Sequence, residues 1–214
     1  MPDKHERSSV WDEYEWERFL QQQDRQTDRY MELLEKHMHD PERDQIIAEE
    51  MGWPSFPNNF DFEPDFDFSA ALDEEELDEE IAELHAPEDF ELHPLYQSCF
   101  ALTVWLDQIL DEQCDALIAS SAVKLATNSA IASAKLAAAL SDDSREELGM
   151  TIAYLKRALK AISNAIEASL VFAEESRLSS HRRRQLHARL FHVRDGIIEL
   201  MGEYRCEWRR RYGR

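Results

Sequence analysis

Proline is missing from more than half of this chain. All seven prolines lie within the first 94 residues, and the 120 residues after Pro94 contain none. Glycine is scarce throughout, with five in total and four of these after Pro94. Proline and glycine are the residues that most often interrupt or end helices. The back of the chain is therefore compatible with long helices, whereas the front is repeatedly interrupted.

The scarcity of glycine also argues against several kinds of active site. The sequence contains no Gly-x-Ser-x-Gly, no phosphate-binding glycine loop and no Cys-x-x-Cys. Phosphate-binding loops need the backbone freedom that glycine supplies. Nothing in the sequence favours catalysis, so we expect a protein that is not an enzyme and needs no cofactor.

Cysteines and long apolar runs are also few. The three cysteines, Cys99, Cys114 and Cys206, are odd in number, fit no zinc-binding spacing and lie in apolar helical contexts, which indicates buried free thiols in a reducing compartment. The first residues have no apolar stretch typical of a secretion signal. The longest mainly apolar run, Cys99–Leu106, is far shorter than the ~20 residues of a membrane span. These features predict a cytoplasmic protein without a membrane segment.

Negative charge is abundant but unevenly distributed. The chain has a formal charge of −21, and residues 40–92 alone carry 20 acidic side chains and one basic one. Residues 1–39 have a net charge of −4, and residues 93–214 have a net charge of +2. A block of this kind is typical of an interaction segment that attracts basic partners.

The front of the chain predicts two helices. Residues 10–39 have apolar side chains at steps of three and four, as in an amphipathic helix. Asp40 and Pro41 have the residue types of an N-cap and a first helical position. They therefore predict a second helix over Pro41–Met51, which the sequence Gly52-Trp53-Pro54 would end.

An acidic, aromatic segment follows these helices. Between residues 53 and 68, phenylalanines alternate with acids and three prolines forbid a continuous helix. Such a pattern is typical of a recognition segment that binds a basic protein surface. The residues expected to bind are Trp53, Phe56, Phe60, Phe62, Phe66, Phe68, Asp61, Asp65, Asp67, Glu74, Glu75 and Glu76. The alternative is that these aromatic side chains pack against the protein's own helices. A short acidic helix over 72–85 follows.

The back of the chain predicts three long helices, over 94–140, 144–177 and 180–212. Between Leu148 and Ala173, and again between Leu186 and Tyr204, apolar residues step by four and three in heptads. Short connections favour antiparallel neighbours. We therefore expect an all-α fold: an antiparallel up-down bundle of these three helices, with the helix at 10–39 either as a fourth member or paired with a second copy in a homodimer. The expected domains are 1–52, 53–92 and 93–214.

Two further groups of polar residues were weighed. Glu167 and Glu174 share one helix face, as do His192, Asp195 and Glu199 on the next predicted helix. They would form a metal site only if both faces turned inward, and solvent exposure is the simpler expectation because charged residues are rarely buried unpaired. The last predicted helix also begins and ends with basic side chains, Arg182, Arg183, Arg184, Arg209, Arg210 and Arg211. Pairing with acidic segments is a better interpretation of these arginines than direct nucleic-acid binding, because the acidic block would compete for them.

The sequence therefore predicts a non-enzymatic protein-interaction module, such as an adaptor, a scaffold or a chaperone-like protein, that presents an acidic-aromatic segment to a basic partner. Two alternatives remain open at this point. One is an acidic protein that imitates nucleic acid and inhibits a DNA- or RNA-binding protein. The other is a metal-dependent helical-bundle enzyme that uses the five polar residues above.

Overall fold

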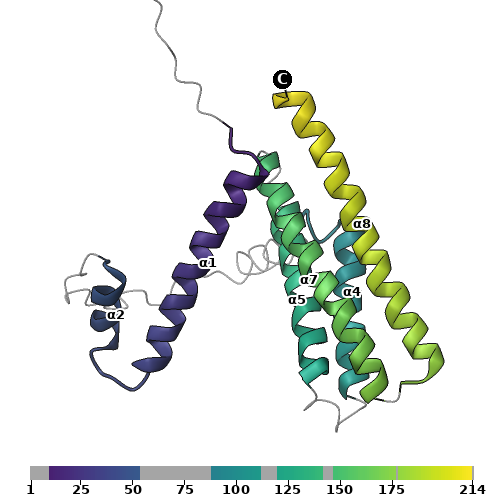
Figure 1. Ribbon diagram of the computed structural model, residues 1–214, viewed down its shortest axis with the longest axis horizontal. Helices are drawn as coiled ribbons and strands as arrows, with labels where there is room; N and C mark the ends of the chain where they lie inside the picture. The colour runs from purple at the N-terminus through teal and green to yellow at the C-terminus, as the bar shows by residue number, and fades with distance from the viewer. Residues whose placement is uncertain (1–9, 54–87, 112–119, 142–146, 177, 214) are drawn as a thin grey trace, which may run out of the picture. The chain divides into compact units, whose positions relative to one another are not determined.

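The described part of the chain is entirely helical, which confirms the all-α prediction (Figure 1). A computed structural model describes residues 10–53, 88–111, 120–141, 147–176 and 178–213. Within these ranges it contains six helices and no strand. The helices are α1 (Glu13–Lys36), α2 (Arg43–Met51), α4 (Pro94–Asp111), α5 (Ser120–Leu140), α7 (Leu148–Glu175) and α8 (Ser180–Tyr212).

The chain divides into two compact units. The first combines Met1–Glu17 with Pro87–Arg214, and the second is Arg18–Ala86. Helix α1 contributes to both, because its N-terminal residues up to Glu17 fall in the first unit and the rest of the helix falls in the second. This division differs from the predicted boundaries at 52/53 and 92/93, which remain predictions.

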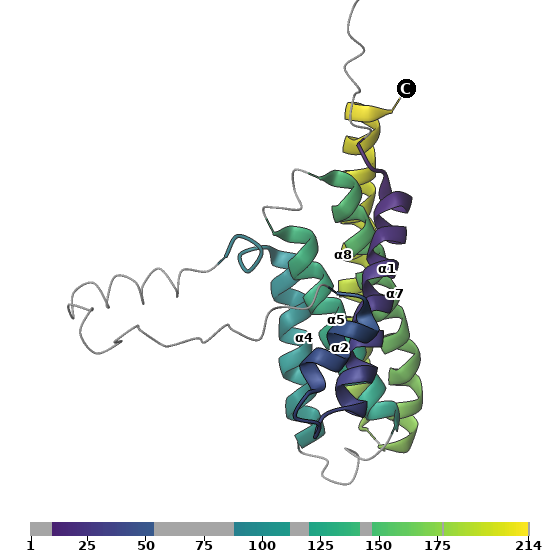
Figure 2. The ribbon, with the colours of Figure 1, turned by 90° about the vertical axis from the view of Figure 1, so that its left-hand side faces the viewer.

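The first unit is built from four helices that share one core. Helix α5 packs against α7, α7 against α8, and α4 against both α5 and α8. Figures 1 and 2 show these four helices lying alongside one another. The buried core residues all lie between Leu95 and Met201, and the largest of them include Phe172, Leu106 and Leu136. The core of this unit is therefore supplied by the back of the chain alone.

Side-chain contacts show the relative directions of two helix pairs. Between α5 and α7, Asn164 donates to Asn128 and Lys135 lies over the ring of Tyr154. The later residue of α5 thus contacts the earlier residue of α7, and the earlier residue contacts the later one. Helices α5 and α7 are therefore antiparallel. In the same way Leu95 of α4 lies beside Gly196, and Trp105 lies beneath Arg189. Helices α4 and α8 are therefore antiparallel too.

The prediction of one unbroken helix over 94–140 is wrong. Residues on either side of 112–119 form two separate helices, α4 and α5, that pack against each other. The halves of a single straight helix cannot meet side by side, so the chain reverses direction between Asp111 and Ser120. The described part of the back of the chain thus supplies four helices instead of the three that the sequence predicts.

The heptads of α7 and α8 occupy the core. Leu148, Ile152, Leu155 and Ile162 are buried along α7. Along α8 the buried heptad positions are Leu186, Leu190, Val193 and Ile197. Helix α8 begins where the sequence predicts, because the side chain of Ser179 accepts a hydrogen bond from the backbone N–H of Arg182.

The described part of the second unit is a helical hairpin. The carboxylate of Asp40 accepts a hydrogen bond from the N–H of Glu42 just before α2 begins. Helix α2 ends at Gly52, which has a φ of 69°. The N–H groups of Gly52 and Trp53 bond back to the carbonyls of Glu49 and Ala48, a Schellman motif. Glycine adopts this left-handed conformation at little cost, which explains the predicted stop.

No helix in the described ranges combines the length and the apolar character needed to cross a membrane.

Candidate functional site

Most of the predicted recognition segment lies outside the residues that the structure describes. This applies to Phe56, Phe60, Phe62, Phe66, Phe68, Asp61, Asp65, Asp67, Glu74, Glu75 and Glu76, and to the predicted helix at 72–85. Trp53 is described and is 46% exposed. Its ring stacks on Tyr30 with centroids 5.7 Å apart. The aromatic residue that opens the segment is therefore at the surface of its unit.

A second acidic-aromatic stretch is described, at the start of α1. Here the sequence reads Trp-Asp-Glu-Tyr-Glu-Trp-Glu over residues 11–17. The Asp12 carboxylate accepts bonds of 2.8 Å from the N–H groups of Tyr14 and Glu15, and Glu15 accepts one from the N–H of Asp12. This reciprocal arrangement satisfies N–H groups that a helix start otherwise leaves unpaired. Trp11–Glu17 is called the docking turn below.

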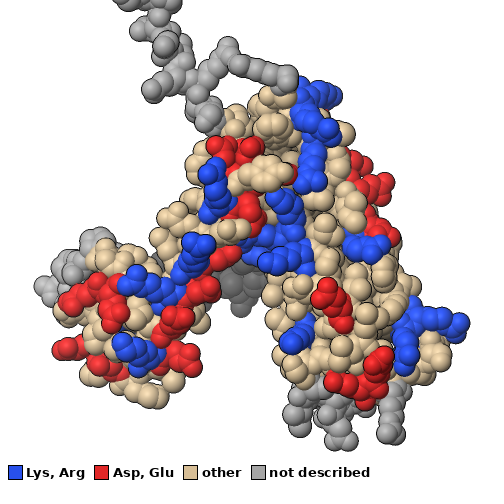
Figure 3. All heavy atoms as spheres, viewed as in Figure 1, with Lys and Arg blue, Asp and Glu red and all other residues tan. Residues whose placement is uncertain are grey.

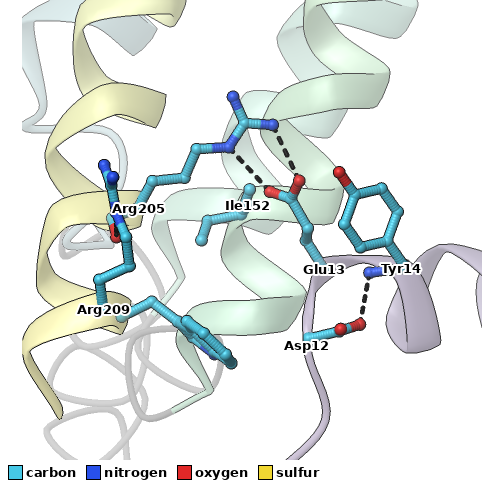
Figure 4. Close-up of a pocket in the computed structure, with 7 residues that line it drawn as sticks. Asp12, Glu13, Tyr14, Ile152, Arg205 and Arg209 are labelled. Atoms are coloured by element: carbon cyan, nitrogen blue, oxygen red, sulfur yellow. Dashed lines mark hydrogen bonds and ion pairs between the residues drawn. The ribbon is translucent and has the colours of Figure 1, made fainter. Parts of the chain in front are cut away.

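Glu13 joins the docking turn to α7 and α8. Arg205 of α8 donates to both carboxylate oxygens of Glu13, through Nε and Nη2, each at 2.9 Å (Figure 4). Lys156 of α7 has its Nζ 4.0 Å from Glu13 and 4.5 Å from the ring centroid of Tyr14. The hydrogen bond with Glu13 raises the pKa of the Arg205 guanidinium above its ordinary value. The Glu13 side chain is 12% exposed, so this pair is better shielded than a typical surface pair.

A second carboxylate of the docking turn, Glu17, contacts α7. Arg157 donates to Glu17 from Nε at 3.2 Å and from Nη2 at 3.4 Å. Glu13 and Glu17 are four residues apart and therefore share one face of α1. Two acids on this face thus meet three basic side chains, Lys156, Arg157 and Arg205, on two helices of the bundle.

Gly149 allows the docking turn to approach α7 closely. A Cβ atom at this position would overlap the carbonyl oxygen of Trp11 and would lie 2.9 Å from Cδ1 of Trp16. The rings of Trp11 and Trp16 are packed edge to face with centroids 5.0 Å apart. The contact therefore combines ion pairs with aromatic packing over a glycine at the start of α7.

A cavity of about 320 Å³ lies beside the Glu13–Arg205 pair (Figure 4). Helix α7 contributes Ile152 to its lining, and α8 contributes Arg205, Trp208 and Arg209. The docking turn contributes Asp12, Glu13 and Tyr14. The Nε1 atom of Trp208 is buried and has no hydrogen-bond partner among the residues described. An unpaired buried donor costs about 1–3 kcal/mol. The described lining residues include no serine, cysteine or histidine, and so they place no nucleophile beside a base.

The arginines at the two ends of α8 are mostly engaged within the first unit. Figure 3 shows the basic side chains that gather at the C-terminal end of this helix. Arg210 and Arg211 both donate to Glu207, and these bonds lower the pKa of that carboxylate. Arg209 donates to the backbone oxygen of Arg205, 3.2 Å away. These contacts agree with the prediction of intramolecular pairing, but the acids involved belong to α8 and not to the acidic block.

At the start of α8, Arg183 donates to the carbonyl of Ala173, 3.0 Å away, in the last turn of α7. A cation at the C-terminal end of a helix is favourable, so Arg183 needs no external anion. The N–H of Arg182 receives the Ser179 cap, and Arg184 is exposed.

The polar residues considered for a metal site are not brought together. Glu167, Glu174, His192, Asp195 and Glu199 are all exposed. Within the described ranges, no three histidine, cysteine, aspartate or glutamate side chains are placed so that they could hold a metal ion. These five residues therefore lie on solvent-facing positions beside the heptads.

The two described cysteines differ in their environment. Cys99 is fully buried in the core, and burial raises the pKa of its thiol to about 12. Cys206 is exposed on α8. The prediction of buried thiols is therefore correct for Cys99 and wrong for Cys206, while Cys114 lies outside the described residues.

Comparison with models of protein families, with curated proteins and with solved structures gives no match in any of the three.

Sequence reasoning did not identify the docking turn as a site. The signal was present, because residues 11–17 combine three aromatic residues with four acids. It was interpreted only as part of an amphipathic stripe. The basic residues that bind it, the adjacent Lys156 and Arg157 and the distant Arg205, lie far from residues 11–17 in the sequence, and only the fold brings them to the turn.

Proposed function

We propose that this protein is a non-enzymatic protein-interaction module that presents the acidic-aromatic segment 53–91 to a basic protein partner. The bundle of α4, α5, α7 and α8 serves as its platform. We also propose that these helices form an antiparallel up-down bundle as a whole. The antiparallel pairs α5–α7 and α4–α8 support that arrangement.

The observation that carries the proposal is the docking turn. It is an acidic-aromatic stretch of this chain that meets basic side chains through ion pairs from Glu13 and Glu17. Segment 53–91 has the same two ingredients in larger amounts, with phenylalanines interleaved among acids. A basic surface on another protein can bind such a segment by the same chemistry, with the aromatic rings supplying affinity and the acids accelerating association.

The distribution of charge gives a second line of support. Residues 40–92 carry a net charge of −19. The arginines that close α8 bond to Glu207 or, in the case of Arg209, to a backbone oxygen of the same helix. These arginines are therefore already engaged within α8, which favours a basic partner as the counter-charge of the acidic block. Trp53, exposed at the start of the segment, is a suitable first anchor.

The experiment is a pull-down with three variants of the full chain. The first lacks residues 53–91. The second replaces Phe60, Phe62, Phe66 and Phe68 by serine and keeps the charge, and the third replaces Asp61, Asp65 and Asp67 by asparagine and keeps the rings. We expect the deletion to abolish partner recovery, the serine variant to weaken binding at all salt concentrations, and the asparagine variant to reduce its salt dependence. Partner recovery equal to that of the unaltered chain in all three contradicts the proposal.

The nucleic-acid-imitation alternative is separated from this proposal by competition. Once a partner is captured, duplex DNA is added to the complex. An imitator competes with the DNA for one surface, whereas simultaneous binding of both eliminates that alternative. No described residue favours imitation, because residues 72–87, which supply most of its candidate carboxylates, lie outside the described part.

We further propose that the protein is a homodimer. Met31 on α1 and Met38 just beyond its C-terminal end are more than half exposed, and exposed apolar surface of this kind is typical of interfaces. Light scattering during size-exclusion chromatography measures the mass directly. We expect the mass of two chains of 25.1 kDa, and the mass of one chain at micromolar concentration contradicts this.

A further inference from the structure

The acidic side chains that line the cavity beside the docking turn differ from its basic side chains in how fully they are paired. Both of its carboxylates are already engaged. Asp12 accepts from two N–H groups at the start of α1, and Glu13 accepts two hydrogen bonds from Arg205. The ring of Tyr14 already has the ammonium group of Lys156 against it. The groups that could bind a cationic ligand, two carboxylates and one aromatic ring, are therefore already engaged.

One of its cationic side chains has no anionic partner among the described residues. Arg209 has no carboxylate within ion-pair distance in the described part of the chain, and its exposed guanidinium is folded back on the carbonyl of Arg205 and the sulfur of Cys206. An exposed arginine changes rotamer on a picosecond-to-nanosecond timescale. It can therefore leave a neutral carbonyl for an anion, which forms a stronger hydrogen bond.

The rest of the lining is apolar. Ile152 and Trp208 belong to the lining, and Tyr14 lies on the opposite side of the view from Arg205 (Figure 4). A space of about 320 Å³ falls at the lower end of the sizes typical of small-molecule pockets. An occupant that fits these surfaces has an apolar, preferably aromatic, body and one anionic group.

We propose that the cavity between the docking turn, α7 and α8 is a binding site for a carboxylate with an apolar body. The carboxylate accepts from the guanidinium of Arg209, and the body packs against the apolar part of the lining, which includes Ile152 and Trp208. A small organic acid and the C-terminal residue of a peptide share this chemistry. No described lining residue belongs to segment 53–91. The test of this site is therefore independent of the test of the function proposed above.

The experiment measures binding to the full chain by calorimetry and by saturation-transfer NMR. The probes are 3-phenylpropionate, the peptide acetyl-Ala-Phe with a free carboxylate, and the same peptide with a C-terminal amide. We expect the two acids to bind and the amide to bind at least about tenfold more weakly, because it lacks the anionic group. Tighter binding of 3-phenylpropionate identifies a small acid as the ligand, and tighter binding of the peptide acid identifies a chain end.

One variant tests the assigned contact, and a second serves as its matched control. Arg209→Gln removes the cation, and we expect it to weaken 3-phenylpropionate binding about five- to tenfold. Arg211→Gln makes the same charge change two residues away, on a side chain that is paired with Glu207. It should leave the affinity unchanged. Circular dichroism shows whether each variant keeps its helices.

Three results overturn the proposal. The first is that neither acid binds at 10 mM or below. The second is that the amide binds as well as the acid. The third is that Arg211→Gln weakens binding as much as Arg209→Gln does, which would mean that the acids respond only to the general charge of the helix end.

Discussion

At the scale of single residues, Glu13 makes more of the described contacts between elements than any other acid in the docking turn. It accepts two bonds from Arg205 and lies near Lys156, so it links α1 to α7 and α8. Its side chain is largely shielded, whereas that of Arg205 is 38% exposed. A pair with one partner partly in water keeps only part of its Coulombic attraction, and we discount its strength accordingly.

We predict a measurable coupling between Glu13 and Arg205. In a double-mutant cycle with Glu13→Gln and Arg205→Gln, the interaction free energy should be about 1 kcal/mol, at the upper end for partly exposed pairs, because the contact is bidentate. Urea unfolding of the four proteins measures it. The control is the pair Lys36–Glu50, whose side chains are 63% and 44% exposed and whose coupling should be below about 0.5 kcal/mol. Equal couplings for the two pairs would contradict the special role of Glu13.

We also predict that Cys99 makes stability depend on pH in alkaline solution. Burial raises the pKa of its thiol from the reference value of 9.0 to about 12. Between these values the unfolded chain loses a proton that the folded chain keeps, so the free energy of unfolding falls as pH rises. The slope from this group is at most about 1.4 kcal/mol per pH unit. Cys99→Ala should remove that slope, as measured by urea unfolding between pH 8 and 10.5, where other groups titrate equally in both proteins. If the free energy of unfolding depends on pH in the same way in both proteins, the thiol of Cys99 is not held protonated by burial.

At the scale of elements, the glycines of α7 and α8 have opposite roles. Gly149 lies under the docking turn, where a Cβ would meet Trp11 and Trp16. Gly202 has nothing within 4 Å of the position of its missing Cβ. Alanine is about 1 kcal/mol more favourable than glycine inside a helix. Replacement of either glycine by alanine therefore favours the helix, but only at Gly149 does the added methyl group meet other atoms.

We predict that Gly202→Ala raises the free energy of unfolding by about 0.5–1 kcal/mol and that Gly149→Ala displaces the docking turn. Amide hydrogen exchange measures the second effect, because residues 14–17 should lose protection in Gly149→Ala while the middle of α7 keeps it. Tryptophan fluorescence should shift to longer wavelength in the same variant. If protection of residues 14–17 is unchanged, the close approach of the turn to Gly149 is not required.

The elements also show how far the sequence determines the fold. The heptads were sufficient to locate most of α7 and α8, because buried apolar residues every three or four positions indicate one helix face, although α7 begins at Leu148 and not at the predicted residue 144. The reversal between α4 and α5 was not predictable in this way. Residues 112–119 contain neither glycine nor proline, so no local signal interrupts the helical pattern. What separates α4 from α5 is the chance to bury Leu102 and Leu106 against α5 and α8, which is a tertiary effect.

The candidate site was less predictable than the helices. The acids of the docking turn are adjacent in sequence, but their partners Arg157 and Arg205 are separated by almost fifty residues. Spacing within one helix indicates which side chains share a face, but it does not indicate which face of α8 meets α7 and α1. The ion pairs and the cavity follow from that packing alone.

At the scale of the whole molecule, charge and core are carried by different parts of the sequence. The acidic excess lies in residues 40–92, whereas residues 93–214 are close to neutral. Every buried residue of the main core lies between Leu95 and Met201. Repulsion among the acidic side chains of residues 40–92 therefore has little effect on the packing of the bundle. The charge of this segment can change without loss of the core.

We therefore predict that residues 88–214 fold alone. The fragment keeps α4, α5, α7 and α8 with their shared core, and it loses the docking turn together with the second unit. We expect one cooperative thermal transition and a midpoint lower than that of the full chain by about 5–10 °C, because the lost contacts are worth a few kcal/mol at most. The full chain with Glu13→Gln and Glu17→Gln is the matched comparison, since it loses the same ion pairs but keeps its length. A fragment that retains helical circular dichroism but unfolds gradually and binds ANS would show that the core is incomplete without the front. In that case the docking turn would be a structural part of the bundle, and displacing it could not serve as a reversible step in binding.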